Sequence, residues 1–394
     1  MIDKNAENLL SHCEWSFPVP IAYGPGRLAE LGPRAMDMGL ANALIVTDRG
    51  SAQLPFIGAL QRALKATGIS SDVFADVAPN PKDTNVASAR QMYRQGGHDA
   101  VIAIGGGSGM DAGKATALTA NNDCDVWEFD FDRESPVLPT DHEFPTLICI
   151  PTTAGTGAET ESTAMITHTE REMKLCVWHM DLKPSLTLLD PEITVGLPAT
   201  LTAWTGIDAM VHAIEAYCVP DFHPMCDGVA LEALALIGQW LPRAVDAPDS
   251  IMARGGMQVG ACLGGVSFLK GLGLVHAISH MVGAEFDTHH GLTNAIVLPT
   301  VLRFNAPAIS HKLPAMSRAL GLESADFASF DAAICQMLDR LGIPSSLSDI
   351  GVPVEAARSI AEKAHQDAAA ATNPREADVE TIERLVIEAI TKGR

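Results

Sequence analysis

The run Asp99-Ala100-Val101-Ile102-Ala103-Ile104-Gly105-Gly106-Gly107-Ser108 decides how the first half of this chain folds. Its first part is almost entirely apolar and rich in β-branched residues, which is typical of a strand buried on both faces of a parallel sheet. A glycine-rich turn follows at once, and residues 110–118 have the pattern of a helix. Such a turn can direct backbone N–H groups and a helix N-terminus toward a phosphate.

Strand-like and helical segments also alternate on both sides of this run. Apolar, strand-like segments at residues 43–47, 72–77 and 146–150 are separated by helical patterns, which predicts a mostly parallel sheet with helices on both faces. From about residue 194 onward the periodicity is helical, with little β-prone sequence. We therefore predict a Rossmann-like α/β domain over residues 1–193, and an all-helical domain over residues 194–394.

Length and composition agree with two domains in a soluble protein. The 394 residues exceed the size at which one core keeps growing. A net charge of −21 makes nucleic acid and anionic membranes unsuitable partners. The eight cysteines form no CxxC pair, residues 1–8 lack the layout of a signal peptide, and no uncharged apolar run reaches membrane-spanning length. We expect a cytoplasmic protein with free thiols.

A second Gly/Thr-rich turn, residues 152–157, follows the strand at 146–150. Two such turns at neighbouring strand ends would form a crevice that suits a dinucleotide, although Met110 breaks the usual glycine fingerprint. Asp48 follows an earlier strand and would accept a hydrogen bond from a ribose hydroxyl, unless it is only an acid in a surface turn. The candidate cofactor-binding residues are Asp48, Gly105, Gly106, Gly107, Ser108, Asp111, Lys114, Thr152, Thr153, Thr156 and, if it faces the crevice, Lys174.

Two clusters of acids and histidines lie in the helical half. Asp208 and His212 are four residues apart, so they share one face of a helix. The second cluster holds His276, His280, His289 and His290, in apolar and small-residue surroundings. A divalent metal would satisfy several buried imidazoles and a carboxylate at once, whereas any one of these histidines alone is more often an ordinary core residue. Spacing alone favours His276 and His280 as a ligand pair.

Together these runs resemble the iron-containing (group III) alcohol dehydrogenase family, over essentially the whole chain. The matching motifs are 105–114 (GGGSGMDAGK), 151–159 (PTTAGTGAE), 206–217 (GIDAMVHAIEAY) and 276–291 (HAISHMVGAEFDTHHG). The resemblance implies a dinucleotide-binding domain, a helical metal-binding domain and a catalytic site in the cleft between them, an architecture that dehydroquinate synthases share. It also implies iron(II), or zinc as in some members, bound by Asp208, His212, His276 and His290.

The resemblance further implies that His280 handles the proton near the nicotinamide, and that Asp48 favours NAD over NADP. The sequence departs from the family at Met281 and His289, where proline is common; the role of His289 stays open. We predict a metal-dependent, NAD-linked dehydrogenase or reductase of a small alcohol or aldehyde. The alternatives are a dehydroquinate-synthase-type lyase, which would need more basic residues, and a metal-free reductase such as a maleylacetate reductase. A homodimer or larger oligomer is expected, with residues 15–20 as an edge strand.

Overall fold

The computed structural model describes residues 13–15 and 18–394, which form two compact units. The first unit holds the described residues up to Thr153 together with Ala158–Gly196. The second holds Leu197–Arg394 together with Ala154–Gly157, so the chain changes unit three residues after the predicted boundary. The short segment Ala154–Gly157 belongs with the helices, although it directly follows a strand of the first unit.

The first unit is built on one sheet of seven strands in the order β1-β2-β9-β6-β5-β3-β4. Six strands are parallel, and β1 pairs antiparallel with β2 at one edge. The four predicted strands are confirmed to within two residues, whereas β2 and β9 are too short to show a sequence pattern of their own. The strands are β1 (Cys13–Trp15), β2 (Ile21–Tyr23), β3 (Asn42–Asp48), β4 (Ser70–Val77), β5 (Ala100–Gly105), β6 (Thr146–Pro151) and β9 (Leu186–Leu189).

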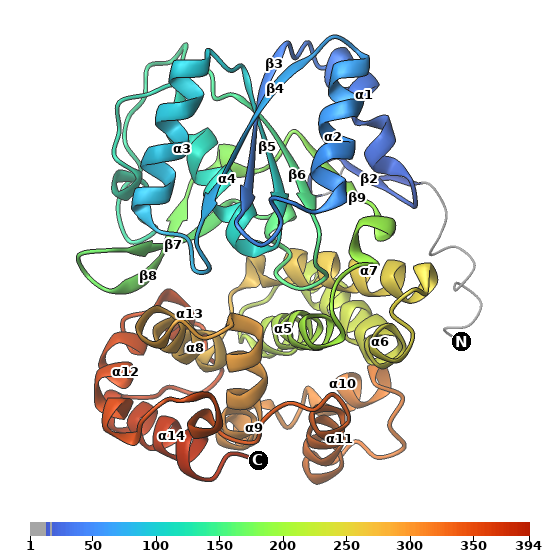
Figure 1. Cartoon of the computed structure of the whole chain (residues 1–394). Helices are drawn as coiled ribbons and strands as arrows, with labels where there is room; N and C mark the ends of the chain where they lie inside the picture. The colour runs from blue at the N-terminus through green and yellow to red at the C-terminus, as the bar shows by residue number, and fades with distance from the viewer. Residues whose placement is uncertain (1–12, 16–17) are drawn as a thin grey trace. The chain divides into compact units, whose positions relative to one another are not determined.

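Helices cover both faces of this sheet (Figure 1). Successive residues of β3 point to opposite faces: Ala43 and Ile45 join one core cluster, while Leu44 and Val46 join the other. The first cluster is completed by α1 (Leu31–Asp37) and α2 (Pro55–Ala66), and the second by α3 (Asp83–Gly96) and α4 (Gly107–Ala120). Because every position of β5 is buried on one face or the other, this central strand is continuously apolar. The predicted α/β class is confirmed.

Two smaller features complete the unit. A separate antiparallel hairpin, β7 (Thr163–His168) with β8 (Met173–Trp178), contains Lys174. The edge strand predicted at residues 15–20 is displaced, because β1 ends at Trp15 and residues 18–20 are not in a strand. Residues 16–17 of that prediction lie outside the described part of the chain.

The second unit is all-helical in its described residues, as predicted. The chain breaks after Ala364, and Asp367 is the N-cap of a new short helix there. The helices are α5 (Ala199–Cys218), α6 (Pro224–Asp246), α7 (Ile251–Ser267), α8 (Leu274–Phe286), α9 (His290–Ile309), α10 (Leu313–Ala319), α11 (Phe327–Arg340), α12 (Ala357–Ala364), α13 (Ala368–Ala371) and α14 (Val379–Thr391).

Among the described residues, no single helix has the length and apolar character that crossing a membrane requires. Only the pair Ile251–Lys270 and Leu274–Phe286 meets that requirement when taken together, and it is bent by 105°.

Candidate active site

Three helices of the second unit bring the acid and the histidines together. Asp208 and His212 lie one turn apart on α5, His276 is on α8, and His290 is the first residue of α9. The Oδ1 atom of Asp208 lies 3.6 Å from His276 Nε2, 3.5 Å from His290 Nε2 and 3.8 Å from His212 Nε2. Asp208, His276 and His290 each offer one ligand atom within 4.8 Å of the others, which is the arrangement a metal ion needs.

His290 reaches this cluster because the chain reverses after α8. The helix ends at Phe286, and Asp287 adopts the left-handed conformation with φ of 52°. Gly291 then lets α9 approach α5 closely, since a Cβ there would lie 2.3 Å from the carbonyl oxygen of Trp204 and 3.1 Å from Asp208 Cβ. A side chain at this position would therefore push His290 away from Asp208.

Asp208, His212 and His276 are buried, and the charges of the cluster shift the pKa values of its members. Burial by itself would raise the pKa of Asp208, but the surrounding imidazoles of His212, His290 and His276 hold that pKa well below its usual range. Burial lowers the pKa of His212 to about 4. Burial acts the same way on His276, but the carboxylates of Asp208 and Glu215 outweigh it and raise that pKa to about 9. Burial thus disfavours a charge on His212, whereas the two carboxylates favour a charge on His276.

The donor count shows that this cluster fits a cation. His276 donates from Nδ1 to Glu215 Oε2 at 2.6 Å, so a cation that displaced the proton on Nε2 would find a lone pair there. The amide nitrogen of Asn294 lies 2.7 Å from Asp208 Oδ1 and 3.2 Å from Nε2 of both His276 and His290. An amide has only two hydrogens and cannot serve three acceptors. A divalent ion held by the carboxylate and the imidazoles satisfies all of them.

His280 takes a different position on the same helix. Its Nδ1 lies 2.8 Å from Oδ2 of Asp367, and its ring stacks on that of His290 with centroids 5.3 Å apart. The nitrogens that converge on Asp208 come instead from His212, His276 and His290. The remaining histidine of the motif, His289, packs its ring 5.0 Å from that of Trp204.

In the first unit, the two predicted turns lie side by side. Strand β5 ends at Gly105, α4 begins at Gly107, and the N–H of Thr152 donates to the carbonyl of Gly105 at 2.9 Å. A Cβ on Gly106 would lie 3.5 Å from the methyl carbon of Thr153. Ser108 lies in the first turn of α4, while Thr156 belongs to the second unit.

Asp48 packs directly over the first turn. A Cβ on Gly105 would lie 2.8 Å from Asp48 Oδ2, and Gly105 has φ of 149°, so only glycine suits this position. The Asp48 carboxylate also accepts hydrogen bonds from the N–H and the hydroxyl of Ser51, at 2.9 and 2.8 Å. Asp48 therefore has a local structural role, in addition to any contact with a ribose.

The polar residues of α4 and β8 are mostly engaged within the unit. Lys114 is completely buried, and its ammonium group donates to the carbonyls of Ala158 at 2.8 Å and Glu161 at 2.7 Å. Burial raises the pKa of Asp111 to about 6. Lys174 is buried in β8, with its Nζ 3.5 Å from Asn80 Oδ1. Lys114 consequently orders the segment after the second turn.

Three residues of the helical unit were not among the predicted site residues. Glu215 had a visible signal, because it lies one turn after His212 in the same helical motif. Asn294 lies four residues after His290 and therefore shares its helix face. Asp367 had no sequence signal, since it lies 87 residues from His280.

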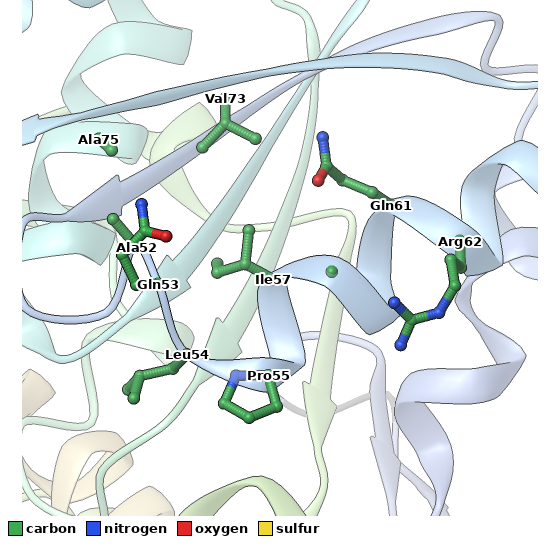
Figure 2. Close-up of a pocket in the computed structure, with 10 residues that line it drawn as sticks. Ala52, Gln53, Leu54, Pro55, Ile57, Gln61, Arg62, Val73 and Ala75 are labelled. Atoms are coloured by element: carbon green, nitrogen blue, oxygen red, sulfur yellow. The ribbon is translucent and has the colours of Figure 1, made fainter.

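The α/β unit also carries a surface pocket between the start of α2 and strand β4 (Figure 2). Its walls include Leu54, Pro55, Ile57, Val73 and Arg62. None of the predicted site residues lines it, and it is distinct from the acid and histidine cluster, which belongs to the other unit.

Known proteins resemble this chain over nearly its full length. The probable alcohol dehydrogenase EutG of Escherichia coli (strain K12) is 36% identical over 377 residues, which cover 95% of this chain and 94% of that protein. The NAD-dependent methanol dehydrogenase of Bacillus methanolicus is 35% identical over 382 residues, covering 95% and 98%. A crystal structure of a 1,3-propanediol oxidoreductase superposes with a TM-score of 0.89 at 32% identity, covering 97% of this chain and all of that one.

Two family models account for both halves of the chain. The model described as iron-containing alcohol dehydrogenase matches residues 18–191, which include both glycine-rich turns. The model for the C-terminal part of the Fe-containing alcohol dehydrogenase family matches residues 202–390, which include the whole acid and histidine cluster. This chain belongs to the iron-containing alcohol dehydrogenase family.

Proposed function

We propose that this protein is a metal-dependent, NAD-linked dehydrogenase that moves a hydride between a small alcohol or aldehyde and the nicotinamide. The convergence of one buried carboxylate oxygen with the imidazole nitrogens carries the proposal, because this set of ligand atoms around one point suits a divalent cation. The names of relatives support the substrate class, since they include a methanol dehydrogenase, 1,3-propanediol dehydrogenases and a 4-hydroxybutyrate dehydrogenase.

Asp208, His276 and His290 would hold the metal, with His212 as the fourth ligand. One carboxylate and three neutral imidazoles leave a net positive centre, which suits iron(II) and also zinc. A cation there supplies a Lewis acid that lowers the pKa of an alcohol O–H. The family description supports iron, and the donor set does not distinguish it from zinc.

The turns at Gly105–Ser108 and Thr152–Thr153 would bind the dinucleotide phosphates through backbone N–H groups and the N-terminus of α4. Asp48 lies over that turn, and its carboxylate would repel a 2′-phosphate, so NAD is the preferred cofactor. Lys114 would stabilise this region through its hydrogen bonds to the carbonyls of Ala158 and Glu161, and Lys174 lies near Asn80. The protein would act as a homodimer or larger oligomer.

His280 would accept the proton of the alcohol at its Nε2, because its Nδ1 faces Asp367. The two alternative activities fit less well. A metal-free reductase has no use for the acceptors around Asp208, and none of the named relatives above is a lyase.

The test is a turnover assay on protein loaded anaerobically with iron(II) or with zinc. NADH formation is followed with methanol, 1,3-propanediol and 4-hydroxybutyrate, and the reverse reaction with the matching aldehydes. We expect net NADH change with at least one pair, lost on chelation and restored by metal. Full turnover after complete metal removal, or none with any alcohol or aldehyde, would contradict the proposal.

A further inference from the structure

Helix α8 presents two imidazoles one turn apart, and each has its Nδ1 against a carboxylate. His276 Nδ1 lies 2.6 Å from Glu215 Oε2, and His280 Nδ1 lies 2.8 Å from Asp367 Oδ2. A carboxylate only accepts hydrogen bonds, so each pair holds a hydrogen on Nδ1 and turns Nε2 the other way. The Nε2 of His276 points to Asp208, as a ligand should.

Asp367 is firmly placed for this contact. Its side chain is 7% exposed, and its other oxygen, Oδ1, accepts from the N–H of Ala369 at 2.8 Å as the N-cap of α13. The same segment is tied to the start of α8, because Thr372 Oγ1 donates to the carbonyl of Leu272 at 2.9 Å and Asn373 Oδ1 accepts from the N–H of Leu274 at 3.2 Å. The carboxylate therefore cannot turn away without breaking the cap.

We propose that Asp367 is the positioning residue that fixes the ring and tautomer of His280. The inference rests on the proposed function and names the group that makes His280 a proton acceptor. In alcohol oxidation the O–H proton would pass to Nε2 of His280, while a bound nicotinamide would take the hydride with its electron pair and the C=O bond would form. The alcohol is oxidised and NAD⁺ is reduced.

The cap function alone does not explain this arrangement. An N-cap needs one side-chain oxygen, and a serine there would supply it. The second oxygen of Asp367 faces the imidazole of His280, which is itself 6% exposed. Because the side chains of His280 and Asp367 are both buried, the pair keeps one geometry. A proton acceptor must be held in such a fixed position.

The test is a double-mutant cycle on the full-length, metal-loaded enzyme, with Asp367→Asn, Asp367→Ser, His280→Ala and the two combinations. Asparagine and serine both keep the cap, so folding is preserved, but neither offers a carboxylate to His280. We expect Asp367→Asn to lower kcat by roughly 10²- to 10⁴-fold, because an amide can stabilise the wrong tautomer. Metal content and the KM for NAD should stay unchanged.

In the His280→Ala background, the Asp367 substitutions should lower kcat no further. A second readout is the ¹⁵N spectrum of histidine-labelled, zinc-loaded protein, in which the His280 signal is identified by its loss in His280→Ala. It should report hydrogen on Nδ1 in the parent and on Nε2 in Asp367→Asn. Glu215→Gln is the matched comparison, which should instead lower metal affinity by roughly 10- to 100-fold.

Equal losses of kcat from Asp367→Asn with and without His280 would make the role purely structural and overturn the proposal. An unchanged His280 tautomer in Asp367→Asn would also overturn it. If His280→Ala keeps the full rate while NADH still forms from alcohol, the inference fails although the dehydrogenase function stands. If no variant or parent turns over any alcohol, the proposed function itself fails.

Discussion

The amide nitrogen of Asn294 lies 2.7 Å from Oδ1 of Asp208, across the contact between α9 and α5. The side chain of Asn294 is fully buried, and its Oδ1 has no hydrogen-bond partner among the described residues. Of the contacts that the amide nitrogen makes with Asp208, His276 and His290, the one with the Asp208 carboxylate is the shortest. If the imidazoles gave their lone pairs to a metal, this hydrogen bond would remain and would hold Asp208 in position.

Replacing Asn294 by alanine should lower metal affinity by roughly 10- to 100-fold, because Asp208 loses the donor that orients it. Competition with a chromogenic chelator measures this directly and does not depend on activity. Asn305→Ala is the matched control, since Asn305 is a buried asparagine of the same helix that pairs with Asn373. Equal metal affinity in the Asn294 variant and its parent would contradict the prediction.

The histidines should separate into ligand and proton acceptor. His290→Ala removes a nitrogen 3.5 Å from Asp208 Oδ1, so both bound metal and activity should be lost. His280→Ala should keep the metal and lose rate by roughly 10²- to 10⁴-fold. Metal analysis of the two purified proteins shows which histidine is the metal ligand and which is the proton acceptor. A metal-free His280→Ala protein beside a fully loaded His290→Ala protein would reverse the two roles.

Cofactor preference should depend on the charge of Asp48. Asp48→Gly should narrow the preference for NAD over NADP, because the carboxylate no longer faces a 2′-phosphate. That change also removes the acceptor for Ser51, so Asp48→Asn is the cleaner variant, keeping an acceptor while removing the charge. The measurement is the ratio of kcat/KM for the two cofactors. Equal use of both by the unmodified enzyme would rule out this role.

Stability should fall with rising pH because of Glu161. Burial raises the pKa of this carboxyl from 4.5 to about 8, so the folded protein holds a proton that the unfolded chain has released between those values. Each pH unit in this window then lowers the free energy of unfolding by up to about 1.4 kcal/mol from this group. The loss is absent below pH 4.5 and complete above about pH 8.

Glu161→Gln removes this titration. Urea unfolding at several pH values should show the variant gaining stability relative to the parent as the pH rises. The exposed residue Glu170 offers the control, because Glu170→Gln should follow the parent at every pH. A constant difference between the Glu161 variant and the parent across the window would show that the buried carboxyl does not titrate as expected.

The sequence by itself determined the elements and the local chemistry. Buried strands such as β5 are uniformly apolar because helices cover both faces, and the glycine-rich turn follows them without interruption. Asp208 and His212 are placed on one face by helical spacing alone. These features depend on neighbours a few residues away, so the pattern of residues is sufficient to predict them. Short strands such as β2 carry too few residues to show any period.

The tertiary structure alone decided which side chains meet. Asn294 and Asp208 are 86 residues apart, and Asp367 and His280 are 87 apart. Their contacts depend on how α9 packs on α5, and on the break after α12 that brings Asp367 to α8. Spacing favoured His276 with His280 as the ligand pair, whereas the reversal at Asp287 brings His290 to Asp208. Helix packing has no period along the chain, so the partner of each imidazole could not be predicted from residue spacing alone.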